Sequence, residues 1–507
     1  MRKTSRRPTR EARKEHTRKR QVAQHQVRQQ RRAAGYKPAP SIANHLSRCA
    51  SIEQEQAERE AAVAGQLGVF RTLLPKLLRD LNKIADLRQA KKVKHKLSVV
   101  LLYGLLSFVF QLASRRQANR ELSRPAFLAT LQSLFPELET LPHGDTLNRV
   151  LSQIDLAELE QAHVKLVRRL IGNKKFRRYL IGHCYPIAND GTQKLTRDGA
   201  WWAEQWLERH HHHTDGNDST EQYVYVLEAN LVFHNGVTLP LLSEFLSYAQ
   251  GDPDDDKQDC ERRAFYRLAE RLKAHFPRLP ILLLLDGLYP TGPLMALCQR
   301  YHWPFMIVLP DQCLPSVWEE VQALKPLQWQ HHKTQPWLGR HQRFWWVNDI
   351  TYAYDHDRYR LTVHVVGCEE TWHAVDPDSA ELIEKHSRHV WLSSERLGAD
   401  NVHERCNLGA RRRWGIETSL LIEKRQGYHY EHAFSYDWNA MQGYHILMRL
   451  AHLINALALA TRAVRSRLAE YGVQAFLAFV RDSCAGRWLR SDWLDQLRHH
   501  PPQVRLA

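Results

Sequence analysis

Five consecutive aliphatic residues, Ile281 to Leu285, lead directly into Asp286 and Gly287. An unbroken apolar run of this kind is typical of a strand that is buried on both faces and therefore lies in the middle of its sheet. A charged helical stretch precedes the run, and an apolar helical stretch and a second short strand follow it. This alternation predicts an α/β fold in which helices flank a mixed sheet.

Three further strands are predicted upstream, over residues 179–188, 223–233 and 237–245, which are rich in Val, Leu, Tyr and Phe. His234-Asn235-Gly236 separates the last two, and Asn-Gly between apolar runs is a strong signal for a β-hairpin. Three antiparallel strands followed by alternating helix and strand describe a ribonuclease H-like layer. The run from His210 to His213 is expected in a solvated loop, because consecutive side chains do not converge on one metal ion.

The chain has 507 residues, enough for several domains. Apolar residues at three- and four-residue spacing predict helices before residue 172, and strand-like runs near Phe344 and Arg360 predict a β-rich insertion. The predicted division is a basic disordered tail at 1–48, a helical N-terminal domain at 49–172, the first part of the ribonuclease H-like core at 173–312, the β-rich insertion at 313–389, the second part of the core at 390–462 and a C-terminal helical segment at 463–507.

Positive charge is concentrated at the N-terminus. The net charge is +17, and residues 1–40 carry 14 Lys or Arg against only Glu11 and Glu15. Such a tail is typically disordered and solvated, and it can also bind nucleic acid because each neutralised phosphate releases counterions. The eight cysteines occur singly, without a C-x-x-C pair, which favours reduced thiols in a cytoplasmic protein over a zinc ribbon or a disulfide framework.

Residues 97–113 form an apolar run flanked by Lys and Arg. Its 17 residues reach the lower limit for crossing a bilayer, but it contains Ser98, Ser107 and Gln111. It is also the single such run in a basic, polar chain. A buried helix is therefore expected here, and a membrane span is the less favoured alternative.

Three acidic residues stand in settings that suggest chemistry. Asp190 follows the first predicted strand and precedes Gly191, Asp286 follows the apolar run, and Glu417 lies in a predicted helix. An Asp-Gly pair after a strand is usually a turn, so neither aspartate indicates catalysis alone. Together, carboxylates at strand ends and on a nearby helix offer the oxygen ligands that Mg²⁺ or Mn²⁺ prefers.

The helix around Glu417 also carries cations at helical spacing. Arg413, Glu417 and Lys424 lie at i, i+4 and i+11, which places all three on one face. The plain interpretation is a salt-bridged, solvated face. The alternative is a metal-binding carboxylate beside cations that hold the phosphates of a nucleic acid, as an enzyme acting on phosphodiesters needs.

These residues resemble the DDE transposases of bacterial insertion sequences, in the group marked by a Tyr-x₂-Arg-x₃-Glu-x₆-Lys signature. Arg413-x₃-Glu417-x₆-Lys424 matches that signature, while Ala410 stands at the tyrosine position. Asp190-Gly-Thr and Asp286-Gly match the two catalytic aspartates of this family. The β-rich stretch between Asp286 and Glu417 matches its insertion domain, and the resemblance covers roughly residues 95–460.

The resemblance implies that Asp190, Asp286 and Glu417 are catalytic and bind Mg²⁺ or Mn²⁺. It further implies contacts to DNA from Arg413, Lys424, Arg412 and Tyr428. The partners would be double-stranded DNA, as transposon ends and target, and a second copy of the chain in a homodimer. The location would be the bacterial cytoplasm, at the nucleoid when bound. In relatives an aromatic of the insertion holds a flipped base; Trp337, Trp345 and Trp346 are candidates, although core positions are expected for each.

Two other functions remain open on the sequence. A ribonuclease H-like nuclease would cut DNA without joining it. A catalytically silent DNA-binding protein derived from a transposase would bind without cutting, but such a protein gains nothing from carboxylates gathered near phosphates.

Overall fold

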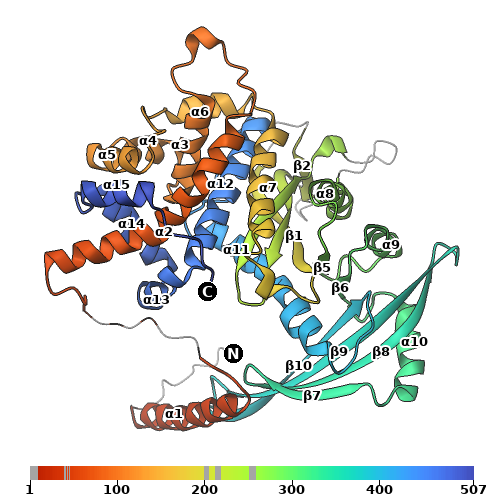
Figure 1. The fold of residues 1–507 in the computed structure, drawn as a ribbon. Helices are drawn as coiled ribbons and strands as arrows, with labels where there is room; N and C mark the ends of the chain where they lie inside the picture. Colours follow the sequence, from red (N-terminus) through yellow and green to blue (C-terminus); the bar gives the residue numbers. More distant parts are fainter. Residues whose placement is uncertain are drawn as a thin grey trace. The chain divides into compact units, whose positions relative to one another are not determined.

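The computed structural model describes residues 10–38, 42, 44, 46–198, 205–211, 219–250 and 259–507. The chain divides into two compact units, a smaller one that takes in residues 1–40 and 285–410 and a larger one made of residues 41–284 and 411–507 (Figure 1). Both combine helices with strands, so the predicted mixed α/β class is confirmed.

The first half of the larger unit is helical, as predicted. Its helices are α2 (Ile52–Leu81), α3 (Leu97–Val109), α4 (Arg115–Leu122), α5 (Pro125–Leu134), α6 (Gly144–Leu151) and α7 (Leu156–Gly172). Nearly every residue of α3 is buried, in contact with α2, α6 and the later helix α12 (Trp438–Leu459). The expected buried helix is therefore confirmed. Within the part of the chain that the structure describes, no helix is long and apolar enough to cross a membrane.

The larger unit also contains a mixed sheet. Its strands are β1 (Tyr185–Asp198), β2 (Leu207–His211), β3 (Ser219–Val232), β4 (Thr238–Phe245) and the first four residues of β5 (Ile281–Leu285). β3 pairs antiparallel with β1, β2 and β4, and β1 pairs in parallel with β5. The predicted hairpin at Asn235-Gly236 joins β3 to β4, and Gly236 has a φ of +91° that favours glycine. All residues of β5 are buried, as the apolar run predicts.

Two predictions on these strands are wrong. The first strand begins at Tyr185, because residues 181–184 form a tight turn, and it continues to Asp198. Residues 191–198 extend it because they keep pairing with β3 as far as Glu221. Asp190 therefore lies inside β1 and not at its end. His210 and His211, expected in a loop, end β2, where their side chains are exposed; His212 and His213 lie outside the described residues.

Among the residues that the structure describes, the larger unit has five further α-helices besides α12. They are α8 (Glu261–His275), α11 (Trp414–Arg425), α13 (Arg462–Tyr471), α14 (Val473–Ala485) and α15 (Ser491–His499). α12 contacts α2, α3, α6, α7 and β4, so it forms the centre of this unit's core. At its start the carboxylate of Asp437 accepts a hydrogen bond from the amide of Ala440 and caps the helix.

The smaller unit is built on an antiparallel sheet in the order β6-β10-β9-β8-β7. Its elements are α1 (Arg10–Ala33), α9 (Gly292–Tyr301), β6 (Phe305–Val308), α10 (Pro315–Leu327), β7 (His332–Trp337), β8 (Arg340–Tyr354), β9 (Tyr359–Val375) and β10 (Leu382–Ser393). Strands β7 to β10 lie in the stretch that was predicted to be β-rich, although α10 precedes them. That this stretch is an insertion into a ribonuclease H-like core stays a prediction. A π-helical turn at Glu404–Gly409 ends the unit.

The basic N-terminal segment corrects another expectation. Residues 10–33, predicted within a disordered tail, form helix α1, which contacts β9. The helix buries Ala23 and Val27, which are one turn apart, and the carbonyl of Ala34 accepts a hydrogen bond from the amide of Gly339. Arg, Lys, Gln and Ala are all good helix formers. The charged segment is therefore helical when its small apolar stripe, Ala23 and Val27, packs against other residues of the smaller unit.

Trp345 and Trp346 are core residues of β8, as expected, with exposed fractions of 7% and 4%. The Lys325 ammonium lies 4.0 Å from the centre of the Trp345 ring. Gly367 is the partner of Trp345 across β8 and β9, and a Cβ atom there would clash with the indole. The ring therefore fills the space that a side chain at position 367 would need.

We expect Gly367→Ala to lower the free energy of unfolding by about 1–3 kcal/mol, because a close-packed ring has to move. Chemical denaturation measures this loss. Gly172→Ala is the matched control, since a Cβ there meets no neighbouring atom. Equal stability of the two variants would show that Trp345 does not fill this space.

Candidate functional site

Asp190 and Glu228 are direct partners across β1 and β3. Opposite residues of an antiparallel pair have side chains on the same face of the sheet. That face is covered by α12, because the Glu228 carboxylate bonds to side chains of this helix, and α11 contacts β1. The other face at this point belongs to α8, since a Cβ on Gly191 would meet Glu261. Asp190 therefore points to the side of the sheet where the helix bearing Glu417 lies.

Asp286 follows β5 directly. The parallel register of β1 and β5 ends at the pair Ala188 and Leu284. Asp190 lies two residues further along β1, whereas Asp286 belongs to the smaller unit. The Oδ1 atom of Asp286 accepts a hydrogen bond from the amide of Leu288 at 2.8 Å. The aspartate thus closes a local turn, as the plain interpretation of Asp-Gly predicts, and it uses one carboxylate oxygen to do so.

Helix α11 places Arg413, Glu417 and Lys424 as their spacing predicts. The Arg413 guanidinium donates to Oε1 of Glu417 at 2.8 Å, and the Arg413 side chain is only 9% exposed. The pair is therefore not a solvated surface pair. The Lys424 ammonium donates to the carbonyl of Gln193 at 3.1 Å, which ties this face of α11 to β1.

The other two residues that the resemblance assigns to DNA lie elsewhere on the larger unit. Arg412 is half-buried and Tyr428 is 2% exposed, with its hydroxyl accepting a hydrogen bond from Asn455. Both line one cavity, which also borders α11.

The donor chemistry of the three predicted carboxylates fits Mg²⁺ or Mn²⁺, which prefer oxygen ligands. Among the described residues, however, no three His, Cys, Asp or Glu side chains gather closely enough to hold a metal ion. Glu417 is paired with Arg413 instead. Joint metal binding by Asp190, Asp286 and Glu417 stays a prediction.

A buried network of charged and polar side chains lies on the face of the sheet to which Asp190 points. At its centre, the Arg449 guanidinium lies 3.1 Å from a carboxylate oxygen of Glu228 on β3 and 3.1 Å from one of Glu423 on α11. His445 binds Glu228 at 3.0 Å and His452 binds Glu423 at 2.6 Å. Arg449 and both glutamates are at most 2% exposed. The network therefore joins β3, α11 and α12 through side chains that are almost fully buried.

Two residues outside the helices complete this network. The Tyr430 hydroxyl donates to Glu228 at 2.9 Å. The Lys194 ammonium, on β1, donates to the carbonyl of Tyr430 at 2.8 Å and lies 3.4 Å from Nδ1 of His445. Burial, which disfavours the charged ammonium, lowers the pKa of Lys194 to about 8. Asp190 and Lys194 both lie on β1, four residues apart. Asp190 is the cross-strand partner of Glu228, and Lys194 completes the network to which Glu228 belongs.

Sequence reasoning missed this network, although a signal was present. His445, Arg449 and His452 recur at four- and three-residue spacing in a helix that is otherwise apolar. Polar residues on the buried stripe of a helix need buried partners, because an unpaired charge in a core is costly. The pattern shows that partners exist but does not name Glu228 or Glu423, which come from distant parts of the chain.

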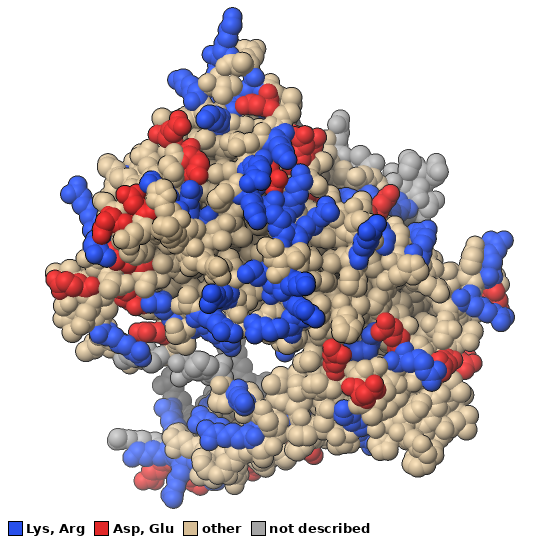
Figure 2. All heavy atoms as spheres, viewed as in Figure 1, with Lys and Arg blue, Asp and Glu red and all other residues tan. Residues whose placement is uncertain are grey.

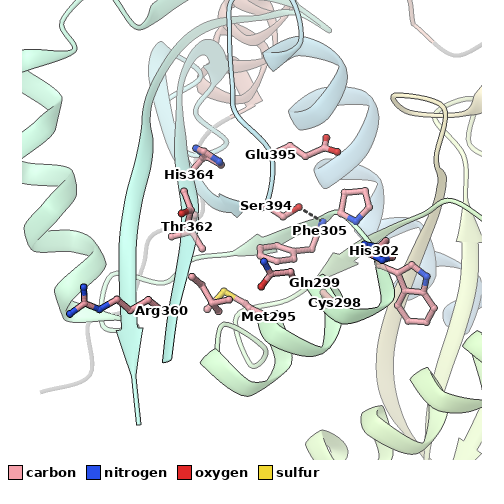
Figure 3. A pocket seen from close by; sticks show the side chains of 14 residues that line it. Met295, Cys298, Gln299, His302, Phe305, Arg360, Thr362, His364, Ser394 and Glu395 are labelled. Atoms are coloured by element: carbon pink, nitrogen blue, oxygen red, sulfur yellow. Dashed lines mark hydrogen bonds between the residues drawn. The ribbon is translucent and has the colours of Figure 1, made fainter. Parts of the chain in front are cut away.

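A separate cavity of about 510 Å³ lies in the smaller unit between α9 and β9 (Figure 3). Gln299 and His302 line it from α9 and its end, and Arg360 and His364 line it from β9. Burial raises the pKa of the neighbouring Cys298 thiol to about 12, so that thiol is not a nucleophile. None of the seven predicted site residues lines this cavity, and we do not assign the function to it.

Positive side chains mark the larger unit. Figure 2 shows Lys and Arg gathered on the visible face of this unit, in the part of the view where α11 lies in Figure 1. A groove of about 950 Å³ is also basic, with Arg115, Arg116 and Arg120 from α4 on one side and His432 on another. Both surfaces suit a polyanion.

We expect Arg449→Met to lower the free energy of unfolding by about 3–5 kcal/mol, because it leaves two buried carboxylates without their cation. Arg358→Met is the matched control. Arg358 forms an exposed 3.7 Å pair with Asp355, so its loss should cost at most about 0.5 kcal/mol. Chemical denaturation of the two variants measures the difference, and equal losses would show that the buried network does not stabilise the fold.

The same network predicts a dependence on acid. Burial alone would raise the pKa of Glu423, but the charge of Arg449 and the hydrogen bond from His452 outweigh it and hold that pKa below 4.5. The unfolded chain then binds more protons between the folded value and 4.5, so this stabilisation is complete above 4.5 and is lost as the pH falls through the folded value. Stability should fall from about pH 5 to about pH 3, and it should fall less in Glu423→Gln.

Denaturation at a series of pH values measures both slopes. The exposed Glu270 of α8 supplies the control, since Glu270→Gln should keep the slope of the unchanged protein. A Glu423→Gln slope as steep as that of the control would mean that Glu423 is not held ionised by its partners.

Residues 78–167 match the family model described as DDE_Tnp_1-associated. The match runs from the end of α2 through most of α7, and so covers helices of the larger unit and none of the predicted catalytic residues. No curated protein matches the chain. The family match associates this protein with DDE-type transposases.

Proposed function

We propose that the protein is a DDE transposase that cuts transposon ends and joins them to target DNA. One arrangement carries the proposal. Asp190 points to the face of the sheet that α11 covers, and α11 bears Arg413, Glu417 and Lys424 and is tied to β1 by the bond from Lys424 to Gln193. The family match at residues 78–167 supports the same class of enzyme. In this proposal the larger unit's sheet is the ribonuclease H-like core.

Each predicted residue has a role in the proposal. Asp190, Asp286 and Glu417 would hold Mg²⁺ or Mn²⁺, which supplies charge to the attacked phosphodiester and lowers the pKa of a bound water. Arg413 is paired with only one oxygen of Glu417, so Oε2 would be available to the metal ion while the guanidinium, with further N–H donors, would contact a DNA phosphate. Lys424 would hold a second phosphate, and Arg412 and Tyr428 would contact DNA from the cavity that they line.

The proposal places the protein in the bacterial cytoplasm, at the nucleoid when bound, and as a homodimer on paired DNA ends. A nuclease that cuts without joining is the alternative from the same fold class. The two differ in one measurable step, the transfer of a cut 3′ end to a second DNA molecule. A catalytically silent binding protein would perform neither step.

We expect Asp190→Asn, Asp286→Asn and Glu417→Gln each to reduce Mg²⁺-dependent cleavage by about 10³-fold or more, since each removes a ligand from a site that acts as a unit. The substrate is DNA carrying the inverted repeats that flank the coding sequence. Each variant should still bind this DNA in EDTA, because the cations that hold phosphates are intact. Removing Mg²⁺ from the unchanged protein should stop cleavage in the same way.

Glu270→Gln is the control for a lost carboxylate, because Glu270 is exposed on α8. Full cleavage by any of the three site variants would contradict the assignment of that residue. Cleavage without joining to a target plasmid would favour the nuclease, and binding without cleavage by the unchanged protein would favour the silent binding protein.

A further inference from the structure

The cavity that Arg412 and Tyr428 line has a volume of about 570 Å³, within the range of sites for small organic ligands. It lies inside the larger unit. Its walls come from α11, the turn between β3 and β4, the end of α12, and helices α13 and α14.

This cavity and the proposed catalytic face lie on opposite sides of α11. Gly415, Ser419 and Ile422 line the cavity, whereas Arg413, Glu417 and Lys424 form the other face. At 3.6 residues per turn, positions 415, 419 and 422 lie roughly half a turn away from positions 413, 417 and 424. The cavity is therefore a second site on the same helix, separate from the proposed metal ligands.

The charged side chains that line the cavity are basic. No Asp or Glu side chain lines it, whereas Arg411, Arg412 and Arg465 do. Neither Arg412 nor Arg465 forms an ion pair with a described residue. Burial lowers the pKa of Arg412, as expected for a guanidinium that has lost water without gaining a carboxylate.

Ser419 gives a second, independent indication of a ligand. The residue is 2% exposed, it lines the cavity, and its Oγ atom has no hydrogen-bond partner among the described residues. Most serines inside helices bond to a carbonyl one turn back, as Thr418 does to Trp414 at 3.1 Å. Leaving a buried hydroxyl without a partner is unfavourable, and a ligand that accepts a hydrogen bond from Ser419 would remove that cost.

The rest of the wall is apolar and partly open. Trp414 is 63% exposed at the rim, and Val473 is 36% exposed beside it. Leu459, Leu468 and Leu477 continue this surface into the cavity. An exposed tryptophan beside buried and half-buried aliphatic side chains suits a flat ring with an apolar face.

We propose that this cavity binds one nucleotide, with its phosphate on Arg412 and Arg465, its sugar or phosphate oxygen accepting a hydrogen bond from Ser419, and its base against Trp414. Anionic oxygens and a planar ring are the two features that the walls recognise together. The nucleotide can come from the end of a DNA strand or from free mononucleotide. This site deepens the proposed function, but binding here needs neither a metal ion nor cleavage.

The test measures binding of three probes to the full chain in EDTA by calorimetry: a short 5′-phosphorylated oligodeoxynucleotide, dAMP and inorganic phosphate. We expect Arg412→Met, Ser419→Ala and Trp414→Ala each to weaken binding of the oligonucleotide by about tenfold or more, the loss typical of one charge-assisted hydrogen bond or one stacked base. Because Trp414 lies at the exposed rim, the Trp414→Ala variant should fold even if a substitution at the buried Ser419 prevents folding.

Arg425→Met is the matched control, because Arg425 is exposed on α11 and does not line the cavity. It removes the same charge from the same helix, and binding of the oligonucleotide should change by less than about threefold. Binding of dAMP as tight as that of the oligonucleotide would identify a free nucleotide as the ligand, and binding of the oligonucleotide alone would identify a strand end.

Three results would overturn the proposal: binding of inorganic phosphate alone, equal losses in Arg412→Met and Arg425→Met, or unchanged binding in Trp414→Ala. The result is separable from the proposed function. A protein that binds the nucleotide but never cuts DNA keeps this site and loses the catalytic assignment, and the Asp190→Asn variant should bind the nucleotide normally.

Discussion

The arrangement of the larger unit depends on one buried cation. The Arg449 guanidinium contacts carboxylates from β3 and α11 at once, and it comes from α12, the helix at the centre of the core. Replacing such a buried network with apolar residues often leaves stability unchanged or raises it. We therefore expect the network to determine how the elements are positioned more than how stable the fold is. The planar guanidinium of Arg449 can donate to Glu228 and Glu423 together only when β3, α11 and α12 are correctly aligned.

This alignment also determines the orientation of α11 and of the side chains on its two faces. Glu423 is held by Arg449, and its neighbour Lys424 is held by a carbonyl of β1. These two contacts at its C-terminal turn restrain α11 against sliding along the sheet or rotating about its axis, and so they help to orient both faces of the helix. One face carries Arg413 and Glu417, and the other lines the cavity of Arg412 and Ser419. A single ion network thereby positions both proposed sites.

The sequence predicted those features that depend on local patterning. The apolar run at β5, the Asn-Gly hairpin, the buried helix α3 and the β-rich insertion each follow from residues that are adjacent or one helical turn apart. Sequence-based prediction was wrong where the structure of a segment depends on contacts with residues far away in the chain. β1 extends past Asp190 because β3 offers partners to residue 198, and α1 forms where Ala23 and Val27 contact a surface within the smaller unit.

The candidate site shows the same division. The spacing of Arg413, Glu417 and Lys424 predicted that they share one helical face, and the ion pair between the first two follows from that spacing. Whether Glu417 binds a metal ion cannot follow from spacing, because it depends on residues more than a hundred positions away and on the competing guanidinium of Arg413. The Arg413 guanidinium partly neutralises Glu417 through Oε1, and this pair leaves the second carboxylate oxygen, Oε2, for another partner. Helical spacing is therefore enough to predict the ion pair, whereas a metal site would also need carboxylates that only the tertiary fold can bring to Oε2 of Glu417.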